Sequence, residues 1–546
     1  MNESIRGQLR APGLLVLAMS AFACDDRGIV GVTSSTVRPE RDAMVLPDAA
    51  GSPDGSVTRI DDCLPVNAAN LDAATAQQLI DGTGDASSMS FLYPYDGTVF
   101  PQGIAAPLLM WSGENADAVY VRLHSTGFDY RGCLKPTGTD LLELPASVWN
   151  VAAASTKGAS DPFTLELKVL TGETIYGPIS EQLVIANGKL AGSVYYMTTV
   201  STFSVGAIMR IPAGRPVEPF LDSANCNGCH SASANGTRLL AYSSGGGSSY
   251  TVSASAPVAP LFSPTPGAEF SAVYPDGSVY VASAHPTGGA GPRTYGGGVT
   301  NAGLYDTATG ALVSDSGLPI GASMPSFSPD GAQLAFTDFG ATNGTTLSSM
   351  SFSIATRTAF GPRRLYTSTT GGFAGWPAFL PDGKGIIFTV GAASDFSGEG
   401  VGLHPGGLPG PSTDVFVVDA ASGTATMLAQ AMGFHSPEEV TATQTYLPGG
   451  TADLHQNYYP TVSPSPSGGY AWAFFDSART YGNLGAHRAI WGTAISVSPG
   501  GTYVTDPSHP AFYLPGQDLT TPNFRAVAVL DPCGPDAGTC ASTGAT

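Results

Sequence analysis

Apolar and polar residues alternate with a period of two over much of the stretch from residue 86 to residue 186. In residues 163–169 (FTLELKV) the apolar side chains fall on one face of an extended chain and the polar ones on the other. Residues 119–123 (VYVRL) repeat the alternation, and residues 108–111 (LLMW) form the apolar run of a fully buried strand. Turn-forming Asp-Gly and Thr-Gly pairs separate these segments, so the pattern predicts a β-sandwich over residues 63–188.

The first strands of this region resemble those of immunoglobulin-like or fibronectin-like modules. The resemblance rests on residues 94–101 (PYDGTVFP) followed by residues 106–112 (APLLMWS). The Cys…Trp…Cys pattern of true immunoglobulin domains is absent, so the resemblance implies the architecture only.

From about residue 190 onward the chain repeats a turn followed by an apolar strand. Successive turn glycines are 41, 54, 52 and 85 residues apart. Such a period, with one turn-and-strand signature per unit, predicts the blades of a β-propeller. Proline presets φ in this turn, aspartate bonds its own backbone and glycine accepts a positive φ. The five copies are residues 233–243 (SANGTRLLAYS), 274–283 (YPDGSVYVAS), 328–337 (SPDGAQLAFT), 380–389 (LPDGKGIIFT) and 463–475 (SPSPSGGYAWAFF).

These copies resemble the TolB-like, WD-type β-propeller repeats, whose hallmark is a Ser-Pro-Asp-Gly turn before an apolar strand. The resemblance covers about 300 residues and implies an all-β propeller over residues 189–500. Six blades are expected, with seven as the alternative. Residues 192–211 could contribute another blade that closes the ring with the C-terminal strands, while residues 501–546 are expected to form a closing segment that is not a blade.

The N-terminus resembles an export signal. Arg6 and Arg10 precede an apolar stretch, residues 11–23, which ends before Cys24. The sequence Ala-Phe-Ala-Cys at the end of this stretch suits both signal peptidase cleavage and lipidation of Cys24. We therefore expect a signal peptide over residues 1–23, then a lipidated Cys24 and a disordered tether over residues 24–62, rich in Asp, Pro, Gly, Ser and Thr.

The cysteine count supports lipidation. The chain has seven cysteines, an odd number for an exported protein, and removing Cys24 leaves six. Cys533 and Cys540 flank a Gly- and Pro-containing loop and are expected to form a small local disulfide. A disulfide between Cys63 and Cys133, joining the tether's end to the sandwich, is the other pairing considered.

Composition and charge exclude one class of partner. The chain has 23 basic and 43 acidic residues, a net charge of −20, so it lacks the basic surface that binds phosphates. We expect no nucleic-acid binding. With its lipid anchor, the protein is expected in the cell envelope, at the outer membrane or facing the periplasm, with a protein or glycan as partner.

One motif carries chemistry. Residues 226–230 read Cys-Asn-Gly-Cys-His, the C-x-x-C-H of c-type haem attachment. In such sites two thiols bond the porphyrin, here Cys226 and Cys229, and the adjacent imidazole, here His230, becomes the proximal iron ligand. The alternatives are a Cys226–Cys229 disulfide, a motif that no longer carries haem, or a metal site completed by another histidine. Residues 216–230 (PVEPFLDSANCNGCH) resemble the lead-in to haem sites of multidomain bacterial cytochromes, a group in which such sites occur beside propeller repeats, including hydrazine-synthase-like subunits.

The second iron ligand is not evident in the sequence. A propeller strand begins a few residues after His230, so a helical cytochrome domain does not fit on that side. Met197, Met209 and His455 are the candidates for a distal ligand, none within a motif. A haem here would therefore be capped by the propeller or have an open sixth position.

No signature of a known catalytic centre appears in the sequence, neither a nucleophile elbow nor a zinc-protease, Walker or dinucleotide motif. The sequence leaves catalysis open and favours a protein that is not an enzyme. Two hypotheses remain: a lipid-anchored haem c module that transfers electrons, and a binding scaffold in which the C-x-x-C-H motif is structural.

Overall fold

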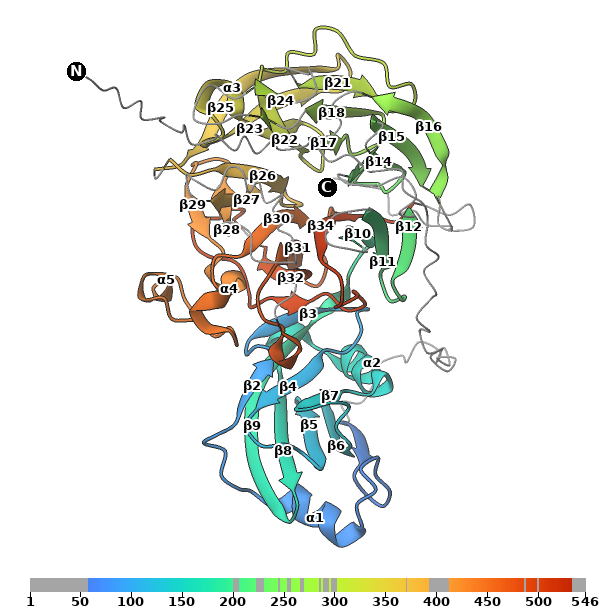
Figure 1. Cartoon of the computed structure of the whole chain (residues 1–546), viewed down its shortest axis with the longest axis vertical. Helices are drawn as coiled ribbons and strands as arrows, with labels where there is room; N and C mark the ends of the chain where they lie inside the picture. The colour runs from blue at the N-terminus through green and yellow to red at the C-terminus, as the bar shows by residue number, and fades with distance from the viewer. Residues whose placement is uncertain are drawn as a thin grey trace, which may run out of the picture.

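The computed structural model describes residues 57–199, 206–221, 230–243, 246–252, 257–265, 270–283, 286–287, 294–295, 302–369, 371–391, 412–485, 488–497 and 500–532. These residues form two β-rich units, a two-sheet sandwich and a ring of sheets above it in Figure 1. Within the described part of the chain, no helix combines the length and apolarity needed to cross a membrane.

Two sheets make up the N-terminal unit, as the alternating pattern predicted. The larger sheet has the order β1(Thr58–Asp62)-β6(Phe128–Leu134)-β5(Ala118–His124)-β8(Phe163–Thr171)-β9(Thr174–Lys189)-β3(Thr98–Gln102). The smaller sheet has the order β2(Ser90–Tyr93)-β4(Leu108–Ser112)-β7(Leu141–Glu143). Three short helices accompany them: α1(Ala73–Asp81), α2(Ala146–Ser155) and the 3-10 turn η1(Gly158–Ser160).

The start of the sandwich differs from the sequence-based expectation. Residues 58–62, expected at the end of the tether, form strand β1 and pair in parallel with β6. The pairing is reinforced by a disulfide between Cys63 and Cys133, both fully buried. Lys168, which the alternation placed on the polar face, is also buried, because its ammonium donates to the carbonyl oxygens of Ile80 and Gly82 at the end of α1, at 2.7 Å each.

The ring consists, in the described residues, of six sheets that follow one another along the chain. Five have four strands each and one has three. A separate two-stranded ribbon joins β19(Pro286–Thr287) and β20(Thr294–Tyr295). The sheets are β12(Glu218–Leu221)-β11(Gly206–Pro212)-β10(Ser193–Thr199)-β34(Asn523–Val529), β13(His230–Ala232)-β14(Arg238–Ser243)-β15(Gly246–Val252)-β16(Pro257–Thr265), β17(Phe270–Val273)-β18(Val279–Ser283)-β21(Gly303–Asp306), β22(Ala322–Phe327)-β23(Gln333–Asp338)-β24(Thr346–Ser353)-β25(Thr358–Thr367), β26(Ala374–Phe379)-β27(Gly385–Gly391)-β28(Thr413–Asp419)-β29(Ala425–Met427) and β30(Asn457–Val462)-β31(Tyr470–Ser477)-β32(Ala489–Ser496)-β33(Phe512–Tyr513).

The innermost strands close the ring. They are β34, β13, β17, β22, β26 and β30, and each contacts the next, with β30 also contacting β34 (Figure 1). Strand β34 pairs antiparallel with β10, so a C-terminal strand completes the sheet begun by residues 193–221. The expectation that these two segments would meet is therefore confirmed. Residues 512–529, expected to lie outside the blades, instead supply β33 and β34 to two sheets of the ring. This strand order is that of an all-β propeller.

The repeated turn has the conformation that its residues predict. The turn glycines have positive φ, for example 72° at Gly331 and 67° at Gly383. The aspartates that precede them bond the backbone two residues on, since Asp330 accepts from the Ala332 amide at 3.0 Å and Asp382 from the Lys384 amide at 2.9 Å. Each turn joins the innermost strand of a sheet to the second one.

The sandwich and the ring share a hydrophobic core. Phe100 of β3 contacts Phe512 of β33, with ring centroids 5.6 Å apart, and Trp149 of α2 meets Phe100 edge to face at 5.5 Å. Tyr93 of β2 accepts a hydrogen bond from the Tyr513 amide at 3.0 Å. Burial of such large side chains stabilises the junction, so the sandwich supports the ring on the side of β32 and β33.

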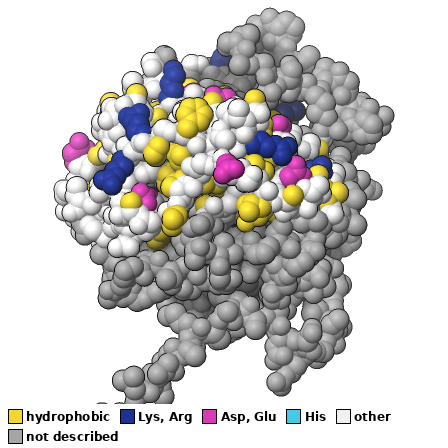
Figure 2. Space-filling model, turned by 90° about the horizontal axis from the view of Figure 1, so that it is seen from above, with side chains coloured by type: hydrophobic (Ala, Val, Ile, Leu, Met, Phe, Trp, Pro, Cys, Tyr) yellow, Lys and Arg dark blue, Asp and Glu magenta, His cyan; other side chains and the backbone are white. Residues whose placement is uncertain are grey.

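The outer strands face solvent. Figure 2 shows hydrophobic side chains on the upper face interspersed with Lys, Arg, Asp and Glu. Leu312, Ile320 and Phe360 are exposed large apolar residues, at 65%, 67% and 55%. The remaining helical turns are short connections in the ring: α3(Phe339–Thr342), α4(Ala429–Met432), α5(Glu439–Ala442), η5(Gly450–Asp453) and η6(Gly482–Leu484).

Candidate functional site

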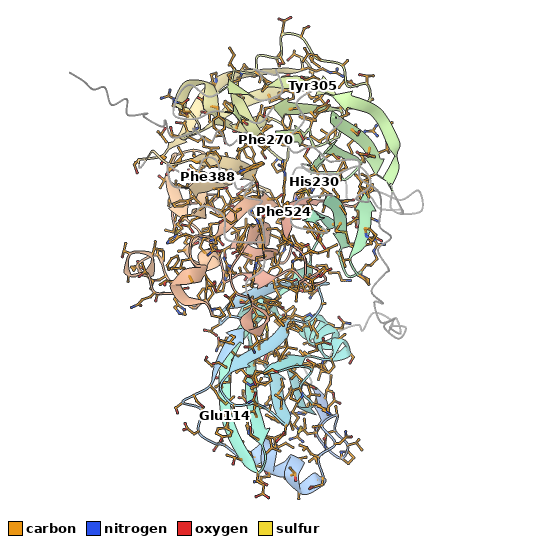
Figure 3. The ribbon with its side chains drawn as sticks, in the orientation of Figure 1. Glu114, His230, Phe270, Tyr305, Phe388 and Phe524 are labelled. Atoms are coloured by element: carbon orange, nitrogen blue, oxygen red, sulfur yellow. A yellow bond between two sulfur atoms is a disulfide. The ribbon has the colours of Figure 1, made fainter. Side chains whose placement is uncertain are left out.

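A cavity of about 170 Å³ lies on the axis of the ring, among its innermost strands. All six of these strands contribute to its lining. His230, from β13, is labelled in Figure 3 close to Phe270 and Phe524, from β17 and β34, at the centre of the ring. Because every sheet reaches this cavity, it is the place where the repeats combine into one site.

Large side chains at corresponding positions of the inner strands border the cavity. Met324 and Trp376 lie seven residues before the turn glycines of their sheets, and Tyr459 lies at the matching point of β30. These three residues and Arg525 of β34 have left-handed backbones, with φ of 49°, 58°, 49° and 56°. Left-handed backbone is uncommon for bulky residues and is retained where the surrounding structure enforces it.

The cause of this backbone is a β-bulge. The pairing of β22 with β23 shifts between Ser323 and Ser326, a step that contains Met324. The pairings of β26 and β30 with their neighbours shift in the same way around Trp376 and Tyr459. A bulge redirects one side chain out of the alternating pattern, so three sheets aim a large residue at the cavity by the same means.

The cavity-lining residues Met324, Trp376, Tyr459 and Arg525, together with Phe270 that packs against them, form what we call the collar. Trp376 meets Phe270 and Tyr459 edge to face, with ring centroids 5.1 and 4.6 Å apart. The Arg525 guanidinium lies over the Trp376 ring, 4.5 Å from its centroid, and 6.0 Å from that of Phe270. A cation over an indole face is held by the ring quadrupole.

The collar has a cation but no acidic group. Among the described residues lining the cavity, Arg525 is the sole arginine or lysine, and none is aspartate or glutamate. The nearby Asp476 carboxylate accepts from the Arg525 backbone amide at 3.1 Å, but its ion pair is with Arg488, at 2.9 Å. Burial raises the pKa of Asp476 to about 6, against the lowering effect of Arg488.

His230 opens the innermost strand of its sheet and pairs with Ala241 of β14. Its side chain lines the cavity and is buried, with 1% of the residue exposed. An imidazole at the edge of a cavity lined by aromatic and hydroxyl side chains fits the chemistry of a proximal haem ligand. The cavity itself is below the roughly 300–1,000 Å³ of pockets that enclose drug-sized ligands, so a porphyrin bound through His230 cannot be enclosed within it.

The other residues of the sequence-based sites are distributed as follows. Cys226 and Cys229 lie outside the described residues, as do Cys24, Cys533 and Cys540. Within the described part of the chain, no cluster of three or more His, Cys, Asp or Glu side chains could hold a metal ion.

None of the three candidates for a distal ligand lines the cavity of His230. Met197 is buried in β10, the strand behind β34, and Met209 in β11 packs against the core shared with the sandwich. His455 lies beside β28, where its Nδ1 is 2.6 Å from the Asp414 carboxylate. This hydrogen bond raises the pKa of His455 above its ordinary value. Met324 is the methionine that does share the cavity with His230.

The sequence analysis did not identify the collar. The signal that could have found it is the proline that follows three of its members, in Met324-Pro325, Trp376-Pro377 and Tyr459-Pro460. Aligning the repeats on their turn glycines places the first two of these pairs in the same column. The residue types there differ from copy to copy, which hides the position from a search for a shared motif.

Comparisons with known proteins give distant structural matches only. No family model matches the sequence, and no curated protein matches it either. TolB from Acinetobacter baumannii is 13% identical with a TM-score of 0.37, and the match covers 74% of this chain and 90% of that one. The Kuenenia stuttgartiensis hydrazine synthase structure contains a chain that is 14% identical with a TM-score of 0.31, covering 61% and 87%. A chain of a nidogen/laminin complex is 12% identical with a TM-score of 0.36, covering 63% and 100%. The propeller assignment rests on this chain's own strand order.

Proposed function

We propose that this protein is an exported β-propeller binding protein that carries covalent haem c beside the axial cavity of its ring. Cys226 and Cys229 would form the two thioether bonds, and His230 would be the proximal ligand of the iron. The haem would supply one-electron redox chemistry, which suits an electron-transfer module with a protein partner docked on the propeller.

The position of His230 carries this proposal. The C-x-x-C-H motif leads directly into β13, so the backbone of His230 is held by the pairing of an innermost strand at the edge of the axial cavity. A strand fixed in this way orients a ligand more precisely than a free loop does. The aromatic residues of the collar beside it would shield one side of the iron site from water. Met197, Met209 and His455 do not line this cavity and are dropped as candidates for the second iron ligand.

A pyridine haemochrome spectrum tests the cofactor. The full chain is expressed in a host with the haem c maturation system, beside a Cys226→Ser, Cys229→Ser variant. We expect the α-band of haem c in the unmodified chain and its loss in the variant. A folded, soluble chain without this band refutes the haem assignment and leaves the second hypothesis, a propeller scaffold in which the motif is structural.

Export and anchoring are a separate part of the proposal. Residues 1–23 direct the chain out of the cytoplasm, and lipidation of Cys24 holds the propeller at a membrane of the cell envelope, within reach of a protein or glycan partner. Metabolic labelling with a radioactive fatty acid tests this. We expect label on the unmodified chain and none on Cys24→Ser, which should move from the membrane to the soluble fraction. Equal membrane retention of both would refute the anchor.

A further inference from the structure

The collar holds a positive charge whose counter-charge is missing from the described residues. Ordinarily an arginine in a partly buried position is paired with a carboxylate. Arg525 is partly buried, lies over Trp376 and borders a cavity with no acidic side chain in its described lining. This is unexpected in a chain with 43 acidic and 23 basic residues, where carboxylates are abundant.

The collar also contributes aromatic side chains to the cavity lining, Trp376 and Tyr459, and Phe270 packs against Trp376. Phe270, Trp376 and Tyr459 meet edge to face, and each is at most 8% exposed. Met324, 2% exposed, adds a polarisable thioether to the same wall. Aromatic side chains in this arrangement bind another ring by offset or edge contacts.

The volume limits the size of what can bind. The cavity of about 170 Å³ has room for roughly ten ordered waters. A ligand of about ten non-hydrogen atoms therefore matches this volume.

We propose that the collar is a binding site for a small aromatic monocarboxylate, with the carboxylate on the Arg525 guanidinium and the ring against Trp376 and Tyr459. Such a ligand supplies the negative charge that the described lining lacks and places its ring on the aromatic part of that lining. The guanidinium fork matches the two oxygens of a carboxylate, and the indole beneath it limits the orientations that the fork can adopt. The proposal uses described residues of the collar only and does not rest on the haem assignment.

Calorimetric titration of the full chain with benzoate tests the proposal. Benzamide, which has nearly the same shape but no charge, is the matched ligand control. We expect saturable benzoate binding in the millimolar range or tighter, and benzamide binding weaker by about tenfold or more, because a charge-assisted hydrogen bond is lost.

Arg525→Gln should weaken benzoate binding by about tenfold or more, and Arg525→Lys should bind more tightly than Arg525→Gln because it keeps the charge. Arg364→Gln, which removes an exposed guanidinium from the outer strand β25, is the matched control and should leave binding unchanged. Circular dichroism confirms that the variants are folded. Equal affinity for benzoate and benzamide, no saturable binding, or equal benzoate affinity of Arg525→Gln and the unmodified chain would overturn the proposal.

Discussion

The ion pair of Arg488 and Asp476 is expected to hold the ring closed beside the collar. Asp476 lies in β31 with a fully buried side chain, and the side chain of Arg488, just before β32, is 5% exposed. Arg488 donates through Nε at 3.0 Å, and the other carboxylate oxygen accepts the Arg525 amide of β34 at 3.1 Å. One carboxylate thus joins three strands at the point where the C-terminal strand completes the ring.

Replacing Arg488 by Met should therefore cost about 3–5 kcal/mol of unfolding free energy at pH 7.5. That is the usual cost of leaving one member of a buried ion pair without its partner. The ring centroid of Tyr458 lies 4.3 Å from the guanidinium carbon of Arg488. Methionine retains much of the side-chain volume beneath this ring, so the lost free energy of unfolding comes mainly from the missing charge and not from a cavity. At pH 5 the loss should shrink, because burial already raises the pKa of Asp476 to about 6 and the unpaired carboxyl takes up a proton.

Urea denaturation followed by tryptophan fluorescence measures this loss, since Trp472 and Trp491 are buried in β31 and β32. Arg131→Met is the control, because the pair of Arg131 with Asp61 is 42% and 34% exposed and should contribute no more than about 1 kcal/mol. If Arg488→Met costs no more than the control at pH 7.5, the pair does not hold the ring closed and this reasoning is wrong.

Three further predictions concern other parts of the molecule. Cys63→Ala with Cys133→Ala should lower the unfolding free energy by about 4 kcal/mol on the chain-entropy model, because the two residues are 70 apart in sequence; urea titration under oxidising conditions measures it, and a loss below 1 kcal/mol would contradict it. Burial raises the pKa of Glu181 to about 9, so the folded chain keeps a proton that the unfolded chain loses, and stability should fall as the pH rises between 4.5 and 9, by at most about 1.4 kcal/mol per unit. Glu181→Gln should remove this pH dependence of stability in melting experiments, and an unchanged pH dependence would show that another group causes it. Asp414 raises the pKa of His455, so the stability that this pair contributes is present below pH 6.5 and is lost as the pH rises through the raised value; Asp414→Asn should lower the His455 pKa toward 6.5 in an NMR titration, and an unchanged pKa would rule out this cause.

The sequence predicts the turns of this fold well because their chemistry is local. A glycine such as Gly331 must accept positive φ, and its neighbouring aspartate bonds the backbone two residues on, so both are visible in a window of four residues. The strand order is less local. The pairing of β34 with β10 joins residues more than 300 positions apart. It was expected because a closed ring needs a last strand, and the residue pattern of neither segment identifies the other as its partner.

The collar could not be predicted from the sequence, for a different physical reason. Its members differ in type, and what they share is a left-handed backbone at a bulge, which depends on pairing with the next strand. Alternation along β22 or β26 predicts the face of each residue only while the register is regular, and at a bulge the rule fails. Burial of Lys168 is a similar case, since its partners are carbonyl groups at the end of a helix some 86 residues away.

The contrast between the turns and the collar separates the scaffold of this propeller from its site. The turn glycines repeat because each sheet must reverse direction in the same way, and a substitution there would be strained in every copy. The collar residues of four sheets share the same left-handed backbone conformation, yet each has a different side chain: Met324, Trp376, Tyr459 and Arg525. A position that is structurally equivalent but chemically different in each sheet makes the centre of a symmetric ring asymmetric. With one cation on one side and aromatic rings beside it, the cavity can distinguish the two ends of a ligand, which a ring of identical residues could not do.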